Sequence, residues 1–329
     1  MDIVGRRRIF YALSGLLVLA SVMALVVFGL TLGIDFTGGS LIEVEFSGSR
    51  PATAELEGRI TALNLGEVRF QPTGAQGVII RVRHVDEATH QEILIRLGGA
   101  SRADGLTPIV ERRFDTIGPT IGRELARKSL LAIGLAILAI VSYIAWAFRK
   151  VSQPVASWKY GLVTVVALAH DVLIPAGFFA VAGRFAGYEV DTLFVTAVLT
   201  ILGFSVHDTI VVFDRIRENL KKAGSAYDFP ALVNQSVNET FVRSLNTSLT
   251  VLIALGAVYL FGGATTKIFS LTLILGIIVG TYSSIFIASP LLVTWLNSSG
   301  GGRRRKHNAK GQSSNVRSSS KLKVQILKF

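Results

Sequence analysis

Six hydrophobic segments, each long enough to cross a lipid bilayer, constrain the fold of this chain more than any other feature. They cover residues 9–32, 129–148, 160–182, 192–213, 244–260 and 268–296. The hydrocarbon core of a bilayer is about 30 Å thick and takes roughly 17 to 25 helical residues to cross. Half of the 329 residues are apolar and the mean hydropathy is +0.52, which is too high for a soluble protein with one buried core. The sequence therefore predicts a polytopic α-helical membrane protein with six transmembrane helices.

The first segment follows an arginine run at residues 6–8, as the apolar region of a signal peptide would. Its apolar stretch is too long for a signal peptide and has no clear small-residue cleavage site. We therefore expect residues 9–32 to remain as a transmembrane helix behind a short N-terminus, residues 1–8.

Basic side chains fall mainly in alternate loops between the segments. One set of short loops contains Arg149, Lys150, Lys159, Arg215, Arg217, Lys221 and Lys222. The other set contains only Arg184 and Lys267. Because cytoplasmic loops are enriched in lysine and arginine, both termini are predicted to be cytoplasmic and the long loop 33–128 to be extracytoplasmic.

The loop 33–128 has the pattern of a folded α+β domain followed by a linker. Period-two alternation predicts strands at residues 42–46 and 78–82, with further strands near 68–70 and 109–114. Helical spacing predicts one helix through Leu56, Ile60 and Leu63 and a second that begins at the N-cap Asp86. The second helix is expected to bury Ile93, Leu94 and Leu97. The order β-α-β-β-α-β predicts a ferredoxin-like domain.

The remaining five hydrophobic segments, residues 129–297, are expected to complete the bundle with the first. The last of them is long enough to tilt or to kink at Pro290. Beyond it, residues 298–329 are rich in glycine, serine and basic side chains and are predicted to be a disordered cytoplasmic tail. Its basic run at residues 303–306 favours binding to anionic membrane lipid, with a ribosome or protein contact as the alternative.

Two charged residues inside the hydrophobic segments are the first candidates for function. A charge at the bilayer centre costs roughly 2.5 to 3.5 kcal/mol on insertion scales, so each one needs a partner or a role. Asp208 lies deep in the fourth segment, and Arg243 comes just before the fifth. We predict that they form an ion pair that breaks when Asp208 is protonated and lets the helices rearrange. The alternative is a static ion pair that fixes helix register.

Two His-Asp dipeptides in neighbouring segments add titratable groups to a predicted proton pathway. His170 precedes Asp171 in the third segment, and His207 precedes Asp208 in the fourth. Each histidine either relays protons or only donates an interhelical hydrogen bond.

A polar stripe runs along the fifth segment. Arg243, Thr247 and Thr250 recur at helical spacing with Asn246 beside them, so we expect these side chains to line the bundle interior. Just after the fourth segment, a surface network at the membrane face is expected from Asp214, Arg215, Arg217, Glu218 and Asn219.

Several classes of chemistry find no support in the sequence. There is no cysteine, so disulfides, a thiol nucleophile and cysteine-bound metals are excluded. The His-Asp pairs lack a zinc motif, and the Gly-Gly pairs at residues 38–39 and 98–99 lie in no nucleotide-binding loop. The net charge of +12 reflects basic residues that flank hydrophobic segments, so nucleic acid is not expected as a partner. We expect no cofactor, no metal and no catalytic residue.

The sixth segment carries small residues every four positions. Gly276, Gly280 and Ser284 form a ridge that allows another helix to approach closely. This ridge serves either packing within the bundle or contact with a partner protein.

Several long motifs resemble those of the SecD/SecF family of protein-export membrane proteins, on its SecF side. Residues 33–40, GIDFTGGS, resemble the family signature, with Asp35, Phe36, Thr37, Gly38 and Gly39 as its centre. Residues 205–219, SVHDTIVVFDRIREN, resemble the fourth-helix motif, and GPTIG at 118–122, His170-Asp171 and RSLNTS at 243–248 agree too. One departure is His207, where many members have asparagine.

The resemblance implies a member of the resistance-nodulation-division superfamily in the bacterial cytoplasmic membrane. It implies SecD as partner, docking on the SecYEG channel, and use of the proton motive force to assist translocation of unfolded preproteins. YajC-like and YidC-like accessory proteins and membrane lipid are further candidate partners. The proton-path aspartate and arginine of the family fall on Asp208 and Arg243.

Two other functions compete with this reading. A small-molecule exporter of the same superfamily combines a proton-coupled bundle with ferredoxin-like outer domains, but usually has two bundles and larger outer regions. A non-conducting assembly factor of the translocon would need the bundle without proton transfer.

Overall fold

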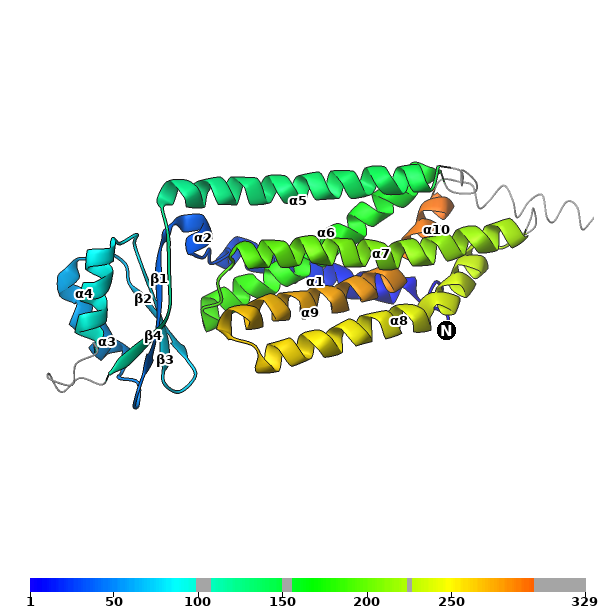
Figure 1. Ribbon diagram of the computed structural model, residues 1–329. Coiled ribbons are helices and arrows are strands. Elements are labelled where there is room, and N and C mark those ends of the chain that lie inside the picture. Colours follow the sequence, from blue (N-terminus) through cyan, green and yellow to red (C-terminus); the bar gives the residue numbers. More distant parts are fainter. Residues whose placement is uncertain (99–107, 150–155, 224–226, 299–329) are drawn as a thin grey trace, which may run out of the picture.

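The chain forms a long helical bundle with a small head domain at one end (Figure 1). The structure is a computed structural model that describes residues 1–98, 108–149, 156–223 and 227–298. The N-terminus lies at the end of the bundle away from the head domain (Figure 1). Nearly all of the predicted basic tail, residues 298–329, lies outside the described residues.

Within the described residues, six helical segments are long and apolar enough to cross a membrane, as expected from the sequence. They are α1 (Arg7–Phe28), α5 (Pro119–Ala147), α6 (Ser157–Ala186), α7 (Thr192–Ala223), α8 (Phe229–Phe261) and a final span of α9 (Ala264–Ser283), η3 (Ser284–Ala288) and α10 (Ser289–Ser298). The N-terminal ends of α5 and α8 and the C-terminal end of α7 extend well beyond the hydrophobic segments. Hydrophobicity marks the part of a helix that can contact lipid, whereas the helix itself continues through its polar ends.

The last span departs from regular α-helix just before Pro290. Residues Ser284–Ala288 form a π turn, and α10 resumes at Ser289. Proline has no backbone N–H, and its ring collides with the carbonyl four residues earlier in a regular helix. The irregularity expected at Pro290 therefore takes the form of a π turn that ends directly before that residue.

The head domain contains a four-stranded antiparallel sheet and two helices on one face of it. Its elements are β1 (Gly39–Phe46), α3 (Thr53–Ile60), η1 (Thr61–Leu63), β2 (Arg69–Thr73), β3 (Gly77–Val82), α4 (Glu87–Leu97) and β4 (Ile109–Ile117). The strand order is β2-β3-β1-β4. This element order and this sheet order are those of a ferredoxin-like fold, which confirms the predicted fold class.

Alternation along the strands sorts side chains between the two faces of the sheet. Ile42, Val44 and Phe46 are buried under α3 and α4, together with Leu56 and Ile93 from those helices. Asp86 caps α4 as predicted, because its carboxylate accepts a hydrogen bond from the Thr89 backbone N–H at 3.0 Å. The other face of the sheet is turned toward the end of the bundle (Figure 1).

Small residues let α9 approach α7 closely. A Cβ atom on Gly276 would lie 2.1 Å from the Cδ1 atom of Ile201, and one on Gly280 would lie 3.1 Å from the Cβ of Ser205. The ridge that includes Ser284 is therefore occupied by α7 of the same chain, and the first of the two alternatives left open by the sequence applies.

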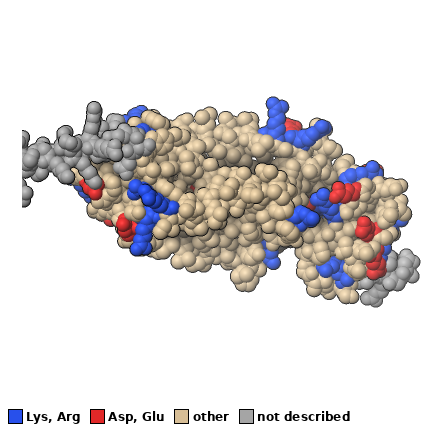
Figure 2. Space-filling view, turned by 180° about the vertical axis from the view of Figure 1, so that it is seen from behind, with Lys and Arg blue, Asp and Glu red and all other residues tan. Residues whose placement is uncertain are grey.

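Charged side chains gather toward the two ends of the molecule. On the face shown in Figure 2, lysine, arginine, aspartate and glutamate surround the head domain and the opposite end of the bundle, and the surface between them is uncharged. Large apolar side chains such as Leu130, Leu138 and Leu16 are exposed along the bundle. This uncharged zone is the part of the surface suited to contact with lipid.

The close contact of α7 and α9 predicts the effect of filling it. Gly276→Leu should lower the free energy of unfolding in detergent by about 1–3 kcal/mol, because the added side chain overlaps Ile201 and forces the helices apart. Gly256→Leu on α8 is the matched control, since no atom lies within 4 Å of a Cβ placed there. Equal stability of the two variants would show that α7 and α9 do not pack as described.

Candidate functional site: buried carboxylates and a head-domain joint

Asp171 of α6 is a fully buried carboxylate held by three side chains. It is 0% exposed. Its Oδ2 accepts hydrogen bonds from the Ser205 hydroxyl of α7 at 2.5 Å and from the Ser283 hydroxyl of α9 at 2.8 Å. Its Oδ1 lies 2.9 Å from the Nδ1 of His170. Donors from three helices therefore converge on one carboxylate.

Asp208 of α7 is also buried, one helical turn from Ser205. Its Oδ2 accepts a hydrogen bond from the Ser284 hydroxyl at the start of the π turn. The buried Ser244 hydroxyl of α8 faces the same carboxylate. Serine hydroxyls thus bind both acids, with His170 as a further partner of Asp171, and neither acid pairs with a lysine or arginine among the described residues.

The two carboxylates belong to one polar belt across α6, α7, α8 and the last span. Asp171 and Asp208 bind the adjacent residues Ser283 and Ser284. One turn earlier in the last span, the hydroxyls of Thr281 and Ser248 lie 2.6 Å apart and continue the belt to α8. Hydroxyl donors reduce the cost of holding a carboxylate in an apolar interior, because each stabilises the charged form.

The predicted ion pair between Asp208 and Arg243 is not formed in the structure. Arg243 makes no ion pair with any residue that the structure describes, and its side chain is exposed on α8. Its neighbour Ser244 occupies the inward face of α8 and takes the place expected for the arginine. Successive helical residues point about 100° apart, so an outward Arg243 and an inward Ser244 are compatible.

The polar stripe of α8, defined as Arg243, Asn246, Thr247 and Thr250, is exposed and does not line the bundle interior. The inward face of α8 instead carries Ser244 and Ser248 at i, i+4 spacing. Two parallel polar faces on one helix have the same periodicity, and the sequence pattern does not show which one faces inward.

The two histidines differ in their surroundings. His170 is 6% exposed, packs against the ring of Tyr282 and has no hydrogen-bond partner at its Nε2. His207 is exposed beside Asp208. Of these two histidines, His170 is the one that forms a hydrogen bond with a buried carboxylate, that of Asp171.

The residues after the fourth hydrophobic segment form a network of charges at the bundle end away from the head domain. Arg215 binds Glu218 at 2.6 Å and Glu239 of α8 at 2.5 Å. Asp214 pairs with Arg217 at 2.5 Å. Asn219 donates to Ser236 and Glu239 of α8, each at 2.9 Å. These contacts hold the ends of α7 and α8 together.

The signature segment around residue 35 forms a joint between the head domain and the bundle. The short helix α2 (Ile34–Thr37) connects α1 to β1. The Asp35 carboxylate accepts hydrogen bonds from the backbone N–H of Thr192, at 2.9 Å, and from the Thr192 hydroxyl. Asp35 thus caps the N-terminus of α7, although the two residues are far apart in sequence.

The two glycines of the signature are required by close backbone contacts. Gly38 has φ +74° and a Cβ there would lie 2.7 Å from the Cα of Pro119, at the start of α5. Gly39 has φ +135° and a Cβ there would lie 2.7 Å from the Val82 carbonyl oxygen. A Cβ on Gly122 would likewise meet the Gly38 backbone nitrogen at 2.8 Å. Glycine is needed at these positions because no side chain fits.

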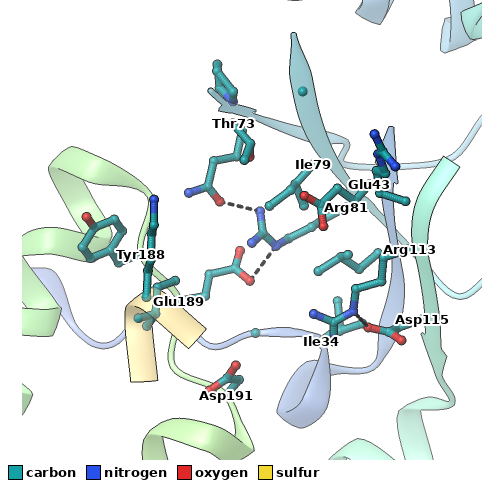
Figure 3. A pocket seen from close by; sticks show the side chains of 18 of the residues that line it. Ile34, Glu43, Thr73, Ile79, Arg81, Arg113, Asp115, Tyr188, Glu189 and Asp191 are labelled. Atoms are coloured by element: carbon teal, nitrogen blue, oxygen red, sulfur yellow. Dashed lines mark hydrogen bonds and ion pairs between the residues drawn. The ribbon is translucent and has the colours of Figure 1, made fainter. Parts of the chain in front are cut away.

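A cavity of about 870 Å³ lies between the inner face of the sheet and the loop that joins α6 to α7. Figure 3 shows Arg81 of β3 pointing into it toward Glu189 of that loop. The Arg81 Nε lies 2.7 Å from Glu189 Oε2, and the Arg81 Nη1 donates to Gln71 Oε1 at 2.9 Å. Among the described residues, this is the ion pair that joins the head domain to the bundle.

The same loop is fixed on its other side. The backbone N–H of Val190 donates to the Thr31 carbonyl at 2.8 Å, and the Gly33 N–H donates to the Val190 carbonyl at 2.8 Å. Asp191 accepts a hydrogen bond from the Phe194 N–H at 2.9 Å, in the first turn of α7. Burial raises the pKa of both Glu189 and Asp191, while the nearby Arg81 opposes the change at Glu189.

Sequence reasoning missed the roles of five residues in these two sites. Ser205 and Ser283 were not singled out, and Ser284 was considered only as a small packing residue. The one available signal was the i, i+3 spacing of Ser205 and Asp208. Arg81 and Glu189 lie in segments that no motif connects, so their pairing could be found only in three dimensions.

Metal binding is not supported by the geometry of the described ranges. Across residues 1–98, 108–149, 156–223 and 227–298, no three side chains among histidine, aspartate and glutamate come together as a metal site would require.

The fold and the site define a multi-span membrane protein whose bundle buries two hydroxyl-bound carboxylates below a ferredoxin-like head domain. Residues 102–298 match the model of the family "Protein export membrane protein SecD/SecF, C-terminal", and residues 24–49 match the SecD/SecF GG motif. The chain belongs to the SecD/SecF family of membrane-embedded translocase components, a family of transport proteins and not of enzymes.

Curated relatives show where in this family the chain falls. It is 44% identical to the protein translocase subunit SecF of Thermobaculum terrenum, with 90% of this chain and 94% of the relative covered. It is 41% identical to the SecF subunit of Anaerolinea thermophila, again over 90% and 94%. The protein translocase subunit SecDF of Brucella abortus is 35% identical over 87% of this chain, which covers 36% of that longer relative.

A solved structure agrees with the fold. The crystal structure of SecDF from Thermus thermophilus superposes with a TM-score of 0.74 at 32% identity over 90% of this chain. The chain spans 39% of that SecDF chain. The sequence resemblance to the SecD/SecF family is therefore confirmed.

The buried Glu189 gives the joint a defined pH dependence. A carboxyl group whose pKa is raised on folding contributes stability that is fully present below its ordinary value of 4.5 and is lost as the pH rises through the raised value. The glutamine side chain in the Glu189→Gln variant cannot ionise. The thermal midpoint of this variant should therefore fall less than that of the unmodified protein as the pH rises from about 4.5 toward neutrality. Melting curves across this range measure the difference.

Glu57→Gln on α3 is the control for Glu189→Gln, because Glu57 is exposed and the charge change is the same. The control should keep the pH dependence of the unmodified protein. The pKa of Asp191 is also raised by burial. The thermal midpoint of the Glu189→Gln variant should therefore still fall as the pH rises, but less steeply than that of the unmodified protein. Identical pH profiles for both variants would contradict a buried role for Glu189.

Proposed function

We propose that this chain is a proton-coupled SecF-type subunit that works with SecD. It uses the proton motive force to assist the passage of unfolded preproteins through the SecYEG channel. The observation that carries this proposal is the pair of buried carboxylates, Asp171 and Asp208. Serine hydroxyls bind both, His170 also contacts Asp171, and neither acid pairs with a lysine or arginine among the described residues. No catalytic residue is part of the proposal.

Hydroxyl partners suit a carboxylate that gains and loses a proton. A hydroxyl donates to the charged carboxylate and accepts from the protonated acid, so neither state leaves a buried group without a partner. A fixed cation would instead favour only the charged state. Moving one charge across the membrane yields about 2.3 kcal/mol per 100 mV, which biases a two-state element by more than tenfold.

The exposed polar stripe of α8 supports a partner inside the membrane. Ser244 is buried on the face of α8 turned toward Asp208, so its neighbour Arg243 lies close to the depth of the buried carboxylates. An arginine facing lipid at such a depth is unfavourable by several kcal/mol. The longer SecDF relatives, of which this chain covers less than half, are named for SecD and SecF together. We infer that the bundle of SecD covers this stripe.

The orientation belongs to the same proposal. We propose that both termini are cytoplasmic. The support is the positive-inside rule, because the bundle end away from the head domain carries the basic residues Arg7, Arg149, Lys159, Arg215 and Lys222. The head domain faces the other side, where the emerging preprotein arrives. The joint at Arg81 and Glu189 transmits movement between the bundle and the head domain. YajC-like and YidC-like proteins and anionic lipid complete the set of candidate partners.

A non-conducting scaffold is the second candidate function. The three donors on Asp171 also suit a static polar contact that fixes helix positions. Proton-dependent secretion separates the two functions, because a scaffold needs assembly alone.

Asp208→Asn should abolish the part of preprotein secretion that depends on the proton gradient in vesicles that contain SecYEG, SecD and this chain. Asparagine keeps the hydrogen bond with Ser284 but cannot bind and release a proton. We expect the stimulation by the gradient to fall at least tenfold, while assembly of the complex stays normal. Secretion measured with and without an uncoupler gives the result.

Asp228→Asn is the control for the secretion assay. Asp228 precedes α8 and its side chain makes no capping hydrogen bond, so gradient-driven secretion should be unchanged. Full secretion by Asp208→Asn in a correctly assembled complex would refute proton coupling at this residue and favour the scaffold.

A cysteine crosslink tests the partner of α8. The chain has no cysteine, so Asn246→Cys introduces a single thiol into the polar stripe. It should crosslink to a cysteine in a transmembrane helix of SecD, whereas Leu130→Cys on the exposed surface of α5 should not. Equal yields at both positions would contradict a specific contact between SecD and this stripe.

A further inference from the structure

Two consecutive serines in the last span bind two different carboxylates. Ser283 ends α9 and donates to Asp171 of α6 at 2.8 Å. Ser284 opens the π turn and donates to Asp208 of α7. Both serines are 0% exposed. Because they share one peptide unit, a shift of this point in the span changes both hydrogen bonds together.

Each serine hydroxyl has a second acceptor on its own helix. The Ser283 hydroxyl lies 3.1 Å from the Gly280 carbonyl oxygen, and the Ser284 hydroxyl lies 3.0 Å from the Thr281 carbonyl oxygen. A hydroxyl carries one proton and cannot donate fully to two acceptors. The carboxylate and the helix carbonyl therefore compete for it.

Protonation of the carboxyl group decides this competition. A charged carboxylate only accepts hydrogen bonds, so it draws the serine proton away from the helix carbonyl. A protonated carboxyl group donates its own proton to the serine oxygen, and the serine proton then turns to the carbonyl three residues earlier. Hydroxyl bonds of this kind to a preceding carbonyl bend helices.

The π turn is the place where such a bend has most effect. The regular ladder of backbone hydrogen bonds is interrupted over Ser284–Ala288, and the Ser289 hydroxyl donates to the Ser284 carbonyl at 3.2 Å. Pro290 contributes no backbone N–H to this part of the ladder. A change in the hydrogen bonds that the carbonyls of residues 280 and 281 accept therefore acts next to the least regular turn of the span.

We propose that Ser283 and Ser284 are positioning residues that transmit the protonation of Asp171 and Asp208 to the π turn of the last span. The inference rests on the proposed proton-coupled function and identifies the element that the protons move. The two carboxylates act on one peptide unit, so their protonation states influence one another through the position of that unit.

The titratable groups around the serine pair come from each helix packed on it. Asp171 and His170 face it from α6, and Asp208 faces it from α7 with His207 beside it. α8 presents Ser244 inward, and its Arg243 points outward. From α1, Tyr11 lies 3.0 Å from Thr294 of α10, beyond the π turn. Among the described residues, the titratable groups closest to the serine pair are thus the two carboxyl groups and the histidines beside them.

Hydrogen–deuterium exchange of residues 284–296 tests the inference with the chain in lipid nanodiscs together with SecD. After correction for the intrinsic pH dependence of exchange, the unmodified protein should show a change in backbone protection of about fivefold across the titration of the carboxyl groups. The double variant Ser283→Ala/Ser284→Ala should lose this change. Ser283→Thr/Ser284→Thr keeps both hydroxyls and should retain it.

Two further variants separate this role from general loosening of the span. Ser289→Ala removes a hydroxyl that bonds only to the backbone, so its pH response should remain. Ser284→Ala alone releases Asp208 and keeps Asp171 bound, so it should show a reduced response in a correctly folded protein. Retention of the full response by the double alanine variant would overturn the inference.

The secretion assay and the exchange assay test the two hypotheses separately, so one hypothesis can be wrong while the other is right. If Asp208→Asn stops gradient-driven secretion and the unmodified protein shows no pH-dependent exchange, proton coupling stands and the serine inference is wrong. If the exchange response depends on the serines and Asp208→Asn secretes normally, the serines act as proposed and the proton-coupled function is wrong.

Discussion

The bundle is organised around the need to hold two carboxylates in an apolar interior. Asp171 and Asp208 are almost fully buried, and the structure satisfies them with hydroxyls from neighbouring helices. A serine side chain is short, so the backbone that carries it must come close to the acid. Gly276 and Gly280 permit this approach between α7 and α9, and a large side chain at Gly276 would push the two helices apart. The close packing of the helices and the hydrogen bonding of the buried carboxylates therefore depend on each other. A substitution that changes one of them also changes the other.

The second organising element is the joint below the head domain. Asp35 caps α7, the glycines of the signature fit against α5 and β3, and Arg81 joins the sheet to the loop before α7. All of these contacts meet near the N-terminus of α7, the helix that also carries Ser205 and Asp208 further along. A capped helix end and an ion pair thus connect α7 to the head domain. The family signature is explained as the mechanical connection between the two parts of the chain.

The sequence predicted the fold well because the fold depends on periodic patterns. Long apolar runs defined the spans, and alternation with the Asp86 cap defined the ferredoxin-like domain. The ends of α5, α7 and α8 were misplaced, because hydrophobicity records contact with lipid and does not record where a helix stops. The inward position of Arg243 was wrong for a related reason: Ser244 and Ser248 form a second polar face with the same spacing, and only the neighbouring helices decide between them. The pairing of Ser283 and Ser284 with two acids arises from contacts between helices, which no local pattern encodes.

The way the chain enters and leaves the head domain has a consequence for how such proteins diversify. Gly39, the first residue of β1, and Ile117, the last residue of β4, are direct partners in the sheet. The head domain is thus inserted between α1 and α5 at two points that lie next to each other. A change in its size therefore need not change the spacing of α1 and α5. A head domain of another size would therefore need two adjacent attachment points at this position and a cation opposite Glu189.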